Sequence, residues 1–272
     1  MSKNSGSFRQ KFESLFAAGA IVIAFLVAYY LYSTIMGNPV NFEGGNPKGT
    51  PLPGNYMAII YKGGGIVPIL MTCVLTLFIF VIERFITLNR VKGTGNLAGF
   101  VANLKSLTAK DKIEEAIVAC DVQIGSLANV AKAGLVRYRD LENDETLEKD
   151  QKITSMKQAL EEASALEMPM LSKNMVILST IASISVLIGL IGTVLGMIRA
   201  FAALAQAGGA PNALALATGI SEALINTAFG ITGSTLAIIA FNFFSSKIDA
   251  FTFKIDEAGF SLTQTFAAKI RK

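Results

Sequence analysis

The sequence contains no histidine, which removes several functions from consideration. A Ser-His-Asp triad, a zinc site built on histidine and a proton relay through imidazole all need that residue. Charge is scarce as well, because charged residues make up 16% of the chain, whereas soluble domains carry about 25%. Hydrophobic residues supply 52%, and they gather in long runs. This composition predicts an integral membrane protein.

Cysteine is nearly absent, and both cysteines are interpreted as small buried hydrophobic residues. Cys73 lies in an apolar run and Cys120 in a charged region, so no disulfide between them is expected. The segment from Gly44 to Thr50 is faintly similar to a phosphate-binding loop, but its Lys-Gly-Thr order differs from the Gly-Lys-Thr that such a loop needs. We therefore expect no metal, no cofactor and no catalytic residue, and we predict that the chain is not an enzyme.

Four apolar runs are long enough to cross a bilayer, for which a helix needs about 20 residues. They cover residues 15–36, 66–88, 175–204 and 213–248. The first run has a rival interpretation as a signal peptide, but it exceeds the roughly 7–15 apolar residues of such a peptide, and no small-residue cleavage site follows it. The sequence thus predicts an all-α fold: an integral membrane helical bundle with four spans and a cytoplasmic helical region.

The chain divides into four predicted parts. These are an additional N-terminal transmembrane helix with a periplasmic loop (1–65), a second span with a cytoplasmic helical region (66–174), a helix pair (175–248) and a cytoplasmic tail (249–272). Lys and Arg concentrate in residues 89–174, so the positive-inside rule places this region and both termini in the cytoplasm. The net charge of +4 follows from this topology and does not indicate a nucleic-acid partner.

The fourth apolar run carries one carboxylate, Glu222, at a predicted mid-membrane position. A charged side chain at the centre of a membrane helix costs roughly 2.5–3.5 kcal/mol on insertion scales. Steps of four residues place it on one helix face with other polar and small residues, namely Thr218, Asn226, Gly230 and Ser234. Such a face is expected to line protein or water rather than lipid.

The third apolar run carries small residues that would let a second helix approach closely: Ser185, Gly189, Gly192, Gly196 and Ala200. Thr193 lies among them and has two interpretations, since its hydroxyl can bond back to its own helix or face Glu222 and order water. Glu222 also has two. It is either a buried carboxyl hydrogen-bonded to a neighbouring helix or a group that takes up and releases a proton. With Glu83 at a predicted interface, a carboxyl relay across the membrane would have to use Glu222.

Two stretches of these helices resemble the MotA/TolQ/ExbB proton-channel family, and within it the ExbB/TolQ branch. Ile181–Ile198 is similar to the family's Gly-Leu-x-Gly-Thr-Val-x-Gly helix, and Gly219–Gly230 is similar to its Gly-Ile-x-Glu-Ala-Leu-x-x-Thr-Ala-x-Gly helix. Glu83-Arg84 also looks like the pair that ends the family's first span. Two features depart from the family: Val186 stands where many members have proline, and the helix at 15–36 is additional.

The resemblance implies a pentamer around two transmembrane helices of an ExbD/TolR-like partner, in the bacterial inner membrane. Proton flow through it would energise TonB- or TolA-like proteins. Carried over by position, Glu222 would be the pore carboxylate, with Thr193 and Thr227 lining the proton pathway. Asn226 and Thr218 are expected to join that pathway, while the glycines at 189, 192, 196 and 230 pack the helices. A flagellar or gliding stator subunit and a non-conducting membrane scaffold are the alternatives.

Overall fold

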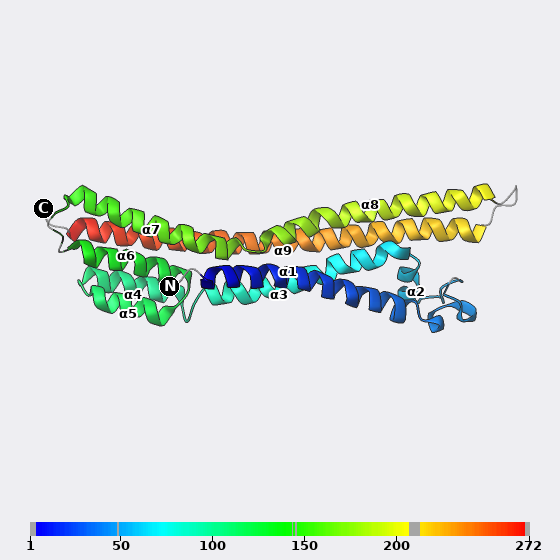
Figure 1. Ribbon diagram of the computed structural model, residues 1–272, viewed down its shortest axis with the longest axis horizontal. Coiled ribbons are helices and arrows are strands. Elements are labelled where there is room, and N and C mark those ends of the chain that lie inside the picture. The colour runs from blue at the N-terminus through cyan, green and yellow to red at the C-terminus, as the bar shows by residue number, and fades with distance from the viewer. Residues whose placement is uncertain (1–3, 48, 143, 145, 207–212, 270–272) are drawn as a thin grey trace. The chain divides into compact units, whose positions relative to one another are not determined.

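The computed structural model describes residues 4–47, 49–142, 144, 146–206 and 213–269. Over these residues the chain is helical and contains no β-strand (Figure 1). The α-helices are α1 (Asn4–Tyr30), α2 (Tyr56–Tyr61), α3 (Val67–Val91), α4 (Leu97–Ala109), α5 (Ile113–Gln123), α6 (Ser126–Glu142), α7 (Lys149–Ser172), α8 (Met175–Gln206) and α9 (Ala213–Lys269). A π-helical turn, η1 (Leu31–Met36), continues α1. Residues 207–212, between α8 and α9, and Lys48, within the segment Gly44–Thr50, lie outside the described residues.

Four helical stretches are apolar and long enough to cross a membrane, which confirms the predicted all-α membrane fold. They are Ala17–Met36, Gly64–Val91, and stretches within Lys149–Ala205 and Ala215–Lys269. The fourth apolar run and most of the tail that follows it form one helix, since α9 continues without a break to Lys269. Charges after Phe244 end the apolar run but not the helix, because no glycine or proline pair interrupts it there.

The described residues form two compact units. The first comprises the described residues of Met1–Val81 and Val176–Phe241, and the second those of Ile82–Met175 and Asn242–Lys272.

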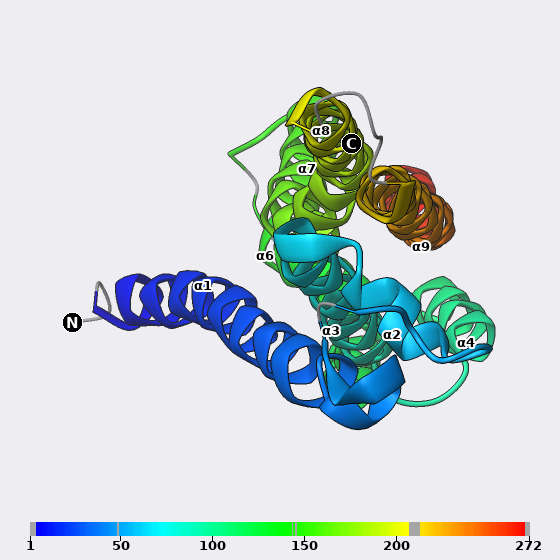
Figure 2. The same cartoon turned by 90° about the vertical axis from the view of Figure 1, so that its right-hand side faces the viewer.

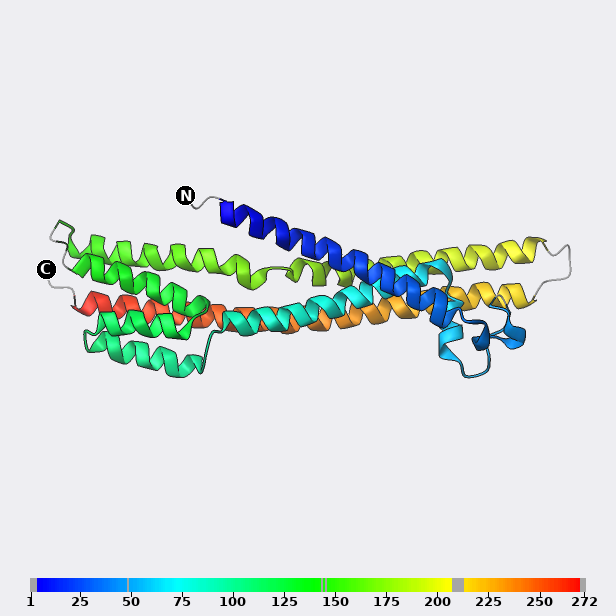
Figure 3. The ribbon, with the colours of Figure 1, turned by 60° about the horizontal axis from the view of Figure 1, so that its bottom comes forward.

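In the first unit, α1 packs through a stripe of alanines. Ala20, Ala24 and Ala28 are buried, while their neighbours Ile21, Val22, Ile23, Phe25 and Leu26 are exposed, as a lipid-facing surface would be. Ala28 forms a core with Val67 and Met71 of α3, to which Ile225 and Phe229 of α9 add. Figures 2 and 3 show the N-terminal end of α1 diverging from α3.

Helices α8 and α9 approach each other closely through glycines, as predicted. A Cβ atom at Gly189 would lie 2.9 Å from the backbone oxygen of Asn226, and one at Gly196 would lie 2.7 Å from the backbone nitrogen of Ala223. A Cβ at Gly230 would lie 2.6 Å from the backbone oxygen of Ser185. Because these neighbours are backbone atoms, any side chain there would force the two helices apart.

The second unit packs α4 to α7 against the end of α9. The apolar face predicted for α5 is buried, with Ile113, Ala116, Ile117 and Cys120 all inside. Burial raises the pKa of the Cys120 thiol to about 12, so it stays protonated at neutral pH and behaves as a small hydrophobic residue. The ring of Tyr138 on α6 lies 4.5 Å from that of Phe266 on α9, which fixes the C-terminal part of α9 to the unit.

Candidate functional site

Glu222 lies on the buried face of α9, among polar and small side chains. Its residue is 5% exposed, and Asn226, one turn further along, is fully buried at 0%. Gly230 and Ser234 continue this face, and the Ser234 hydroxyl donates to the Ala182 carbonyl oxygen of α8 at 2.6 Å. Thr218, one turn before Glu222, is half-buried. The polar face predicted from four-residue steps is therefore directed into the first unit.

An arginine that the sequence analysis did not single out forms an ion pair with this carboxylate. The Nη1 atom of Arg199, on α8, contacts Oε1 of Glu222. The Arg199 side chain is 58% exposed, whereas that of Glu222 is 7% exposed, so the guanidinium connects a buried charge to the surface of the unit. Burying a carboxylate is costly unless an opposite charge compensates it, and Arg199 supplies that charge. A second ionisable residue in an apolar run is the signal that would have identified the pair.

The loop before α3 lies against the Glu222 carboxylate through a glycine, which has no side chain. The Nδ2 atom of Asn226 donates to the Gly63 carbonyl oxygen at 2.9 Å. Gly64 has a φ of +74°, and a Cβ there would collide with the Glu222 carboxylate and lie 3.2 Å from Nη1 of Arg199. Only glycine combines this conformation with so close an approach. The first residue of the candidate span Gly64–Val91 therefore lies against the Glu222 carboxylate.

The two threonines of the predicted pathway meet each other. The Oγ1 atoms of Thr193 on α8 and Thr227 on α9 are in contact. Thr193 also donates to the Gly189 carbonyl oxygen of its own helix at 3.1 Å, and Thr227 to that of Ala223 at 3.2 Å. Of the two interpretations of Thr193, the bond back to its own helix is present. Thr227 is half-buried, beside the Glu222 face but not on it.

The additional N-terminal helix contributes to this site through the same loop. Tyr32, in η1, donates its hydroxyl to the Tyr61 carbonyl oxygen at 3.1 Å, and the two rings stack with centroids 4.7 Å apart. The Phe42 ring meets the edge of Tyr61 at 5.5 Å. Tyr61 precedes the two glycines that cover Glu222 by only a few residues, so contacts from η1 help to position that cover.

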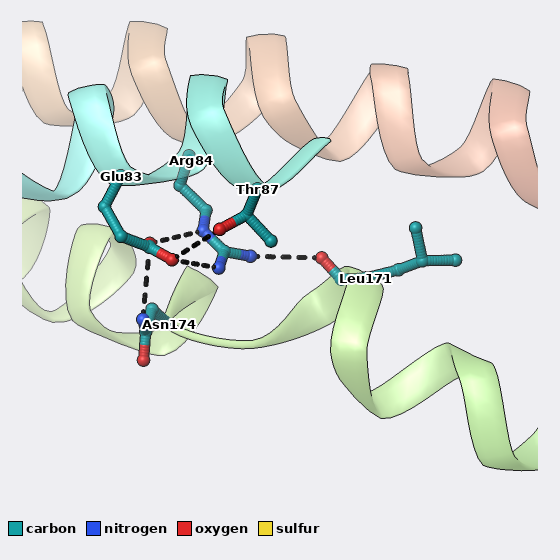
Figure 4. Close-up of polar contacts among 5 residues, drawn as sticks. All are labelled: Glu83, Arg84, Thr87, Leu171 and Asn174. Carbon is teal, nitrogen blue, oxygen red and sulfur yellow. Dashed lines mark hydrogen bonds and ion pairs between the residues drawn. The ribbon is translucent and has the colours of Figure 1, made fainter. Parts of the chain in front are cut away.

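A second polar cluster joins α3 to the break between α7 and α8 (Figure 4). Arg84 is completely buried, and its Nε and Nη2 atoms each lie 2.8 Å from the carboxylate of Glu83. Its Nη1 atom donates to the Leu171 carbonyl oxygen at 3.2 Å, while Thr87 and Asn174 donate to Glu83 at 2.8 and 3.3 Å. Asn174 has a φ of +60°, where the helix is interrupted. The Glu83-Arg84 pair thus connects α3 to the segment between α7 and α8 through hydrogen bonds with Leu171 and Asn174.

Comparison with known proteins agrees with the resemblance read from the sequence. Residues 125–257 match the MotA/TolQ/ExbB proton channel family. The chain is 36% identical over 94 residues to a putative biopolymer transport protein ExbB-like 3 of Synechocystis sp., covering 34% of this chain and 45% of that protein. It is 33% identical over 118 residues to the Tol-Pal system protein TolQ of Pseudomonas aeruginosa, covering 43% of this chain and 51% of TolQ. It is 38% identical over 74 residues to the biopolymer transport protein ExbB of Salmonella typhimurium, covering 27% of this chain and 30% of ExbB.

These matches span about half or less of each relative's length. The family match over residues 125–257 includes Arg199 and Glu222, as well as Thr193 and Thr227.

Proposed function

We propose that this multi-pass membrane protein, similar to the ExbB/TolQ branch of the MotA/TolQ/ExbB proton channel family, is a proton-conducting motor subunit. It would act in the bacterial inner membrane with both termini in the cytoplasm. It would use the proton motive force, as a homo-oligomer (a pentamer by resemblance) around an ExbD/TolR-like partner. Proton flow would move the oligomer and its partner relative to each other. A TonB- or TolA-like protein would pass this movement on to TonB-dependent transport or to work on the cell envelope.

The observation that carries the proposal is the ion pair between the buried Glu222 carboxylate and Arg199, beside the glycine loop before α3. A charge pair placed in a membrane helix bundle is expensive and is most often functional. The surrounding groups suit a carboxyl that changes its charge, since Asn226 holds the cover in place while Arg199 is partly open to its surroundings.

The geometry supports a simple sequence of events. A proton that binds a carboxylate oxygen of Glu222 removes its negative charge and so weakens its attraction to Arg199. The guanidinium, which is already more than half exposed, is then free to turn toward another acid, such as one on the partner. When Glu222 releases the proton on the other side, the ion pair re-forms. Each cycle would thus couple one proton to one movement of a positive charge.

The test replaces Glu222 by glutamine, which keeps the shape and one acceptor oxygen but cannot carry the proton. We expect Glu222→Gln to assemble normally and to reduce proton flux to background in liposomes that contain the chain and its ExbD/TolR-like partner. Thr232→Val is the matched control, because the Thr232 hydroxyl is exposed and bonds only back to Ala228 at 2.8 Å. Wild-type flux in an assembled Glu222→Gln variant would show that the chain is a scaffold or conducts elsewhere.

A further inference from the structure

A groove in the second unit is lined by aromatic side chains at one end and by lysines toward the other. Its volume is about 320 Å³, and it lies between the end of α3 and the part of α9 that follows Asn242. Its lining residues are Phe85, Leu88, Asn89, Val91, Lys92 and Leu97, together with Phe243, Phe244, Lys247, Ala250, Phe251 and Lys254. Nothing in the proposed proton pathway uses these residues.

The two helices contribute matching stripes to this groove. On α3, Phe85, Leu88, Asn89 and Lys92 follow steps of three or four residues, so they share one face. On α9, Lys247, Ala250, Phe251 and Lys254 do the same. The α3 stripe begins with Phe85 and ends with Lys92, and the α9 stripe follows Phe243 and Phe244 and ends with Lys254. Figure 3 shows these segments of α3 and α9 running side by side.

The aromatic end of the groove is a tight cluster of rings. The centroids of Phe85 and Phe244 are 5.0 Å apart, and those of Phe243 and Phe244 are 5.3 Å apart. Phe244 is buried, but Phe85 and Phe243 are 48% and 45% exposed, so they present apolar surface to whatever occupies the groove. Phe85 lies in the candidate span Gly64–Val91, two residues after Glu83, so we place this end at the edge of the hydrocarbon region.

The charged side chains that line the groove are all lysines. Lys92, Lys247 and Lys254 are exposed, and among the residues that line the groove none is acidic. Lys247 lies 5.6 Å from the centre of the Phe243 ring, so its stem follows the aromatic surface. Asp249 lies two residues from Lys247 and therefore on another side of α9. Lys92 directly follows the candidate span that ends at Val91, so we place the lysine end of the groove at the level of lipid headgroups.

We propose that this groove binds one anionic phospholipid, with an acyl chain against the phenylalanines and the phosphate between the lysines. Basic pockets between membrane helices on the cytoplasmic side have the charge that such headgroups require. Ala250, at the centre of the α9 stripe, leaves the room that the glycerol region of the lipid would occupy. The inference does not depend on proton conduction, since it uses a different unit and different residues.

The experiment measures phosphatidylglycerol and phosphatidylcholine adducts on the purified full-length protein by native mass spectrometry, after incubation with equimolar mixed vesicles. Wild type should retain phosphatidylglycerol in preference to phosphatidylcholine. The triple variant Lys92→Gln, Lys247→Gln, Lys254→Gln should lose at least about tenfold of that preference. The control triple Lys105→Gln, Lys110→Gln, Lys149→Gln removes the same charge from exposed positions elsewhere and should keep it.

Two further arms separate the groove from surface charge and from simple anion binding. Ala250→Leu fills the groove without changing charge and should also reduce phosphatidylglycerol retention. Inorganic phosphate at 10 mM, roughly the scale of cellular phosphate, should not displace the lipid if the acyl chain holds it. Equal loss in the two lysine triples, unchanged binding in Ala250→Leu, or complete displacement by phosphate would each overturn the proposal. A cross-link from Phe251 to a second copy in lipid-free protein would assign the groove to an interface between copies.

Discussion

Arg199 changes how the carboxylate beside it is understood. Alone, Glu222 would be an uncompensated charge in an apolar helix. The partly exposed guanidinium of Arg199 compensates that charge. Removing one member of a buried pair leaves the other without compensation, whereas removing both does not. The stability of the first unit should therefore depend on the two residues together.

A double-mutant cycle measures this dependence. We expect Arg199→Gln to destabilise the protein by about 1–3 kcal/mol, less than the roughly 3–5 kcal/mol for a fully buried pair, because the arginine is largely exposed. The double variant Arg199→Gln, Glu222→Gln should recover part of that loss, and thermal unfolding in detergent measures each step. Strictly additive losses would mean that the two side chains do not interact.

At the scale of residues, the sequence predicted which side chains share a helix face, but not which side chain of another helix contacts them. Steps of four residues correctly placed Glu222, Asn226 and Ser234 on one buried face, because helical periodicity is local. The contact between Arg199 and Glu222 depends on how α8 and α9 are aligned after an intervening turn. Periodicity within each helix carries no information on that alignment, so the arginine was not recognised.

At the scale of helices, a contact between two elements could be predicted from the sequence, since the small residues alone indicated close packing of α8 on α9. Glycines spaced along one face of α8 allow its backbone to approach that of α9, and the structure places Gly189 against the backbone of Asn226. The end of α9 was not predictable from hydropathy, because helix formation continues through charged residues when they have good helical propensity.

Two glycine-to-alanine substitutions test whether this packing sets stability. Gly189→Ala should cost about 1–3 kcal/mol, because its new methyl group would lie 2.9 Å from the Asn226 backbone oxygen and the helices cannot yield locally. Gly19→Ala on α1 is the control, since a Cβ there meets nothing within 4 Å and alanine favours the helix. Thermal unfolding of both variants in the same detergent gives the comparison. If Gly189→Ala melted no lower than Gly19→Ala, the close approach of α8 and α9 would be wrong.

At the scale of the whole molecule, four segments far apart in the sequence meet within the first unit. Tyr32 of η1 holds Tyr61, the loop that follows Tyr61 covers Glu222 with Gly64, and Arg199 pairs with Glu222 from α8. Hydropathy predicted the four spans, but it did not give the additional helix a function. The arrangement does so, because that helix is attached to the cover of the candidate site.

This attachment leads to a measurable difference between two neighbouring tyrosines. Tyr32→Leu removes a hydrogen bond and a stacked ring from the loop, so local opening of residues 61–66 should become roughly tenfold more frequent. Tyr30→Leu makes the same chemical change at a side chain that is 61% exposed, and it should leave the loop unchanged. Hydrogen exchange of the peptide that contains Gly63 and Gly64 measures the opening directly. Equal exchange in the two variants would mean that the additional helix only packs beside the unit, whereas faster exchange in Tyr32→Leu alone would connect it to the cover over Glu222.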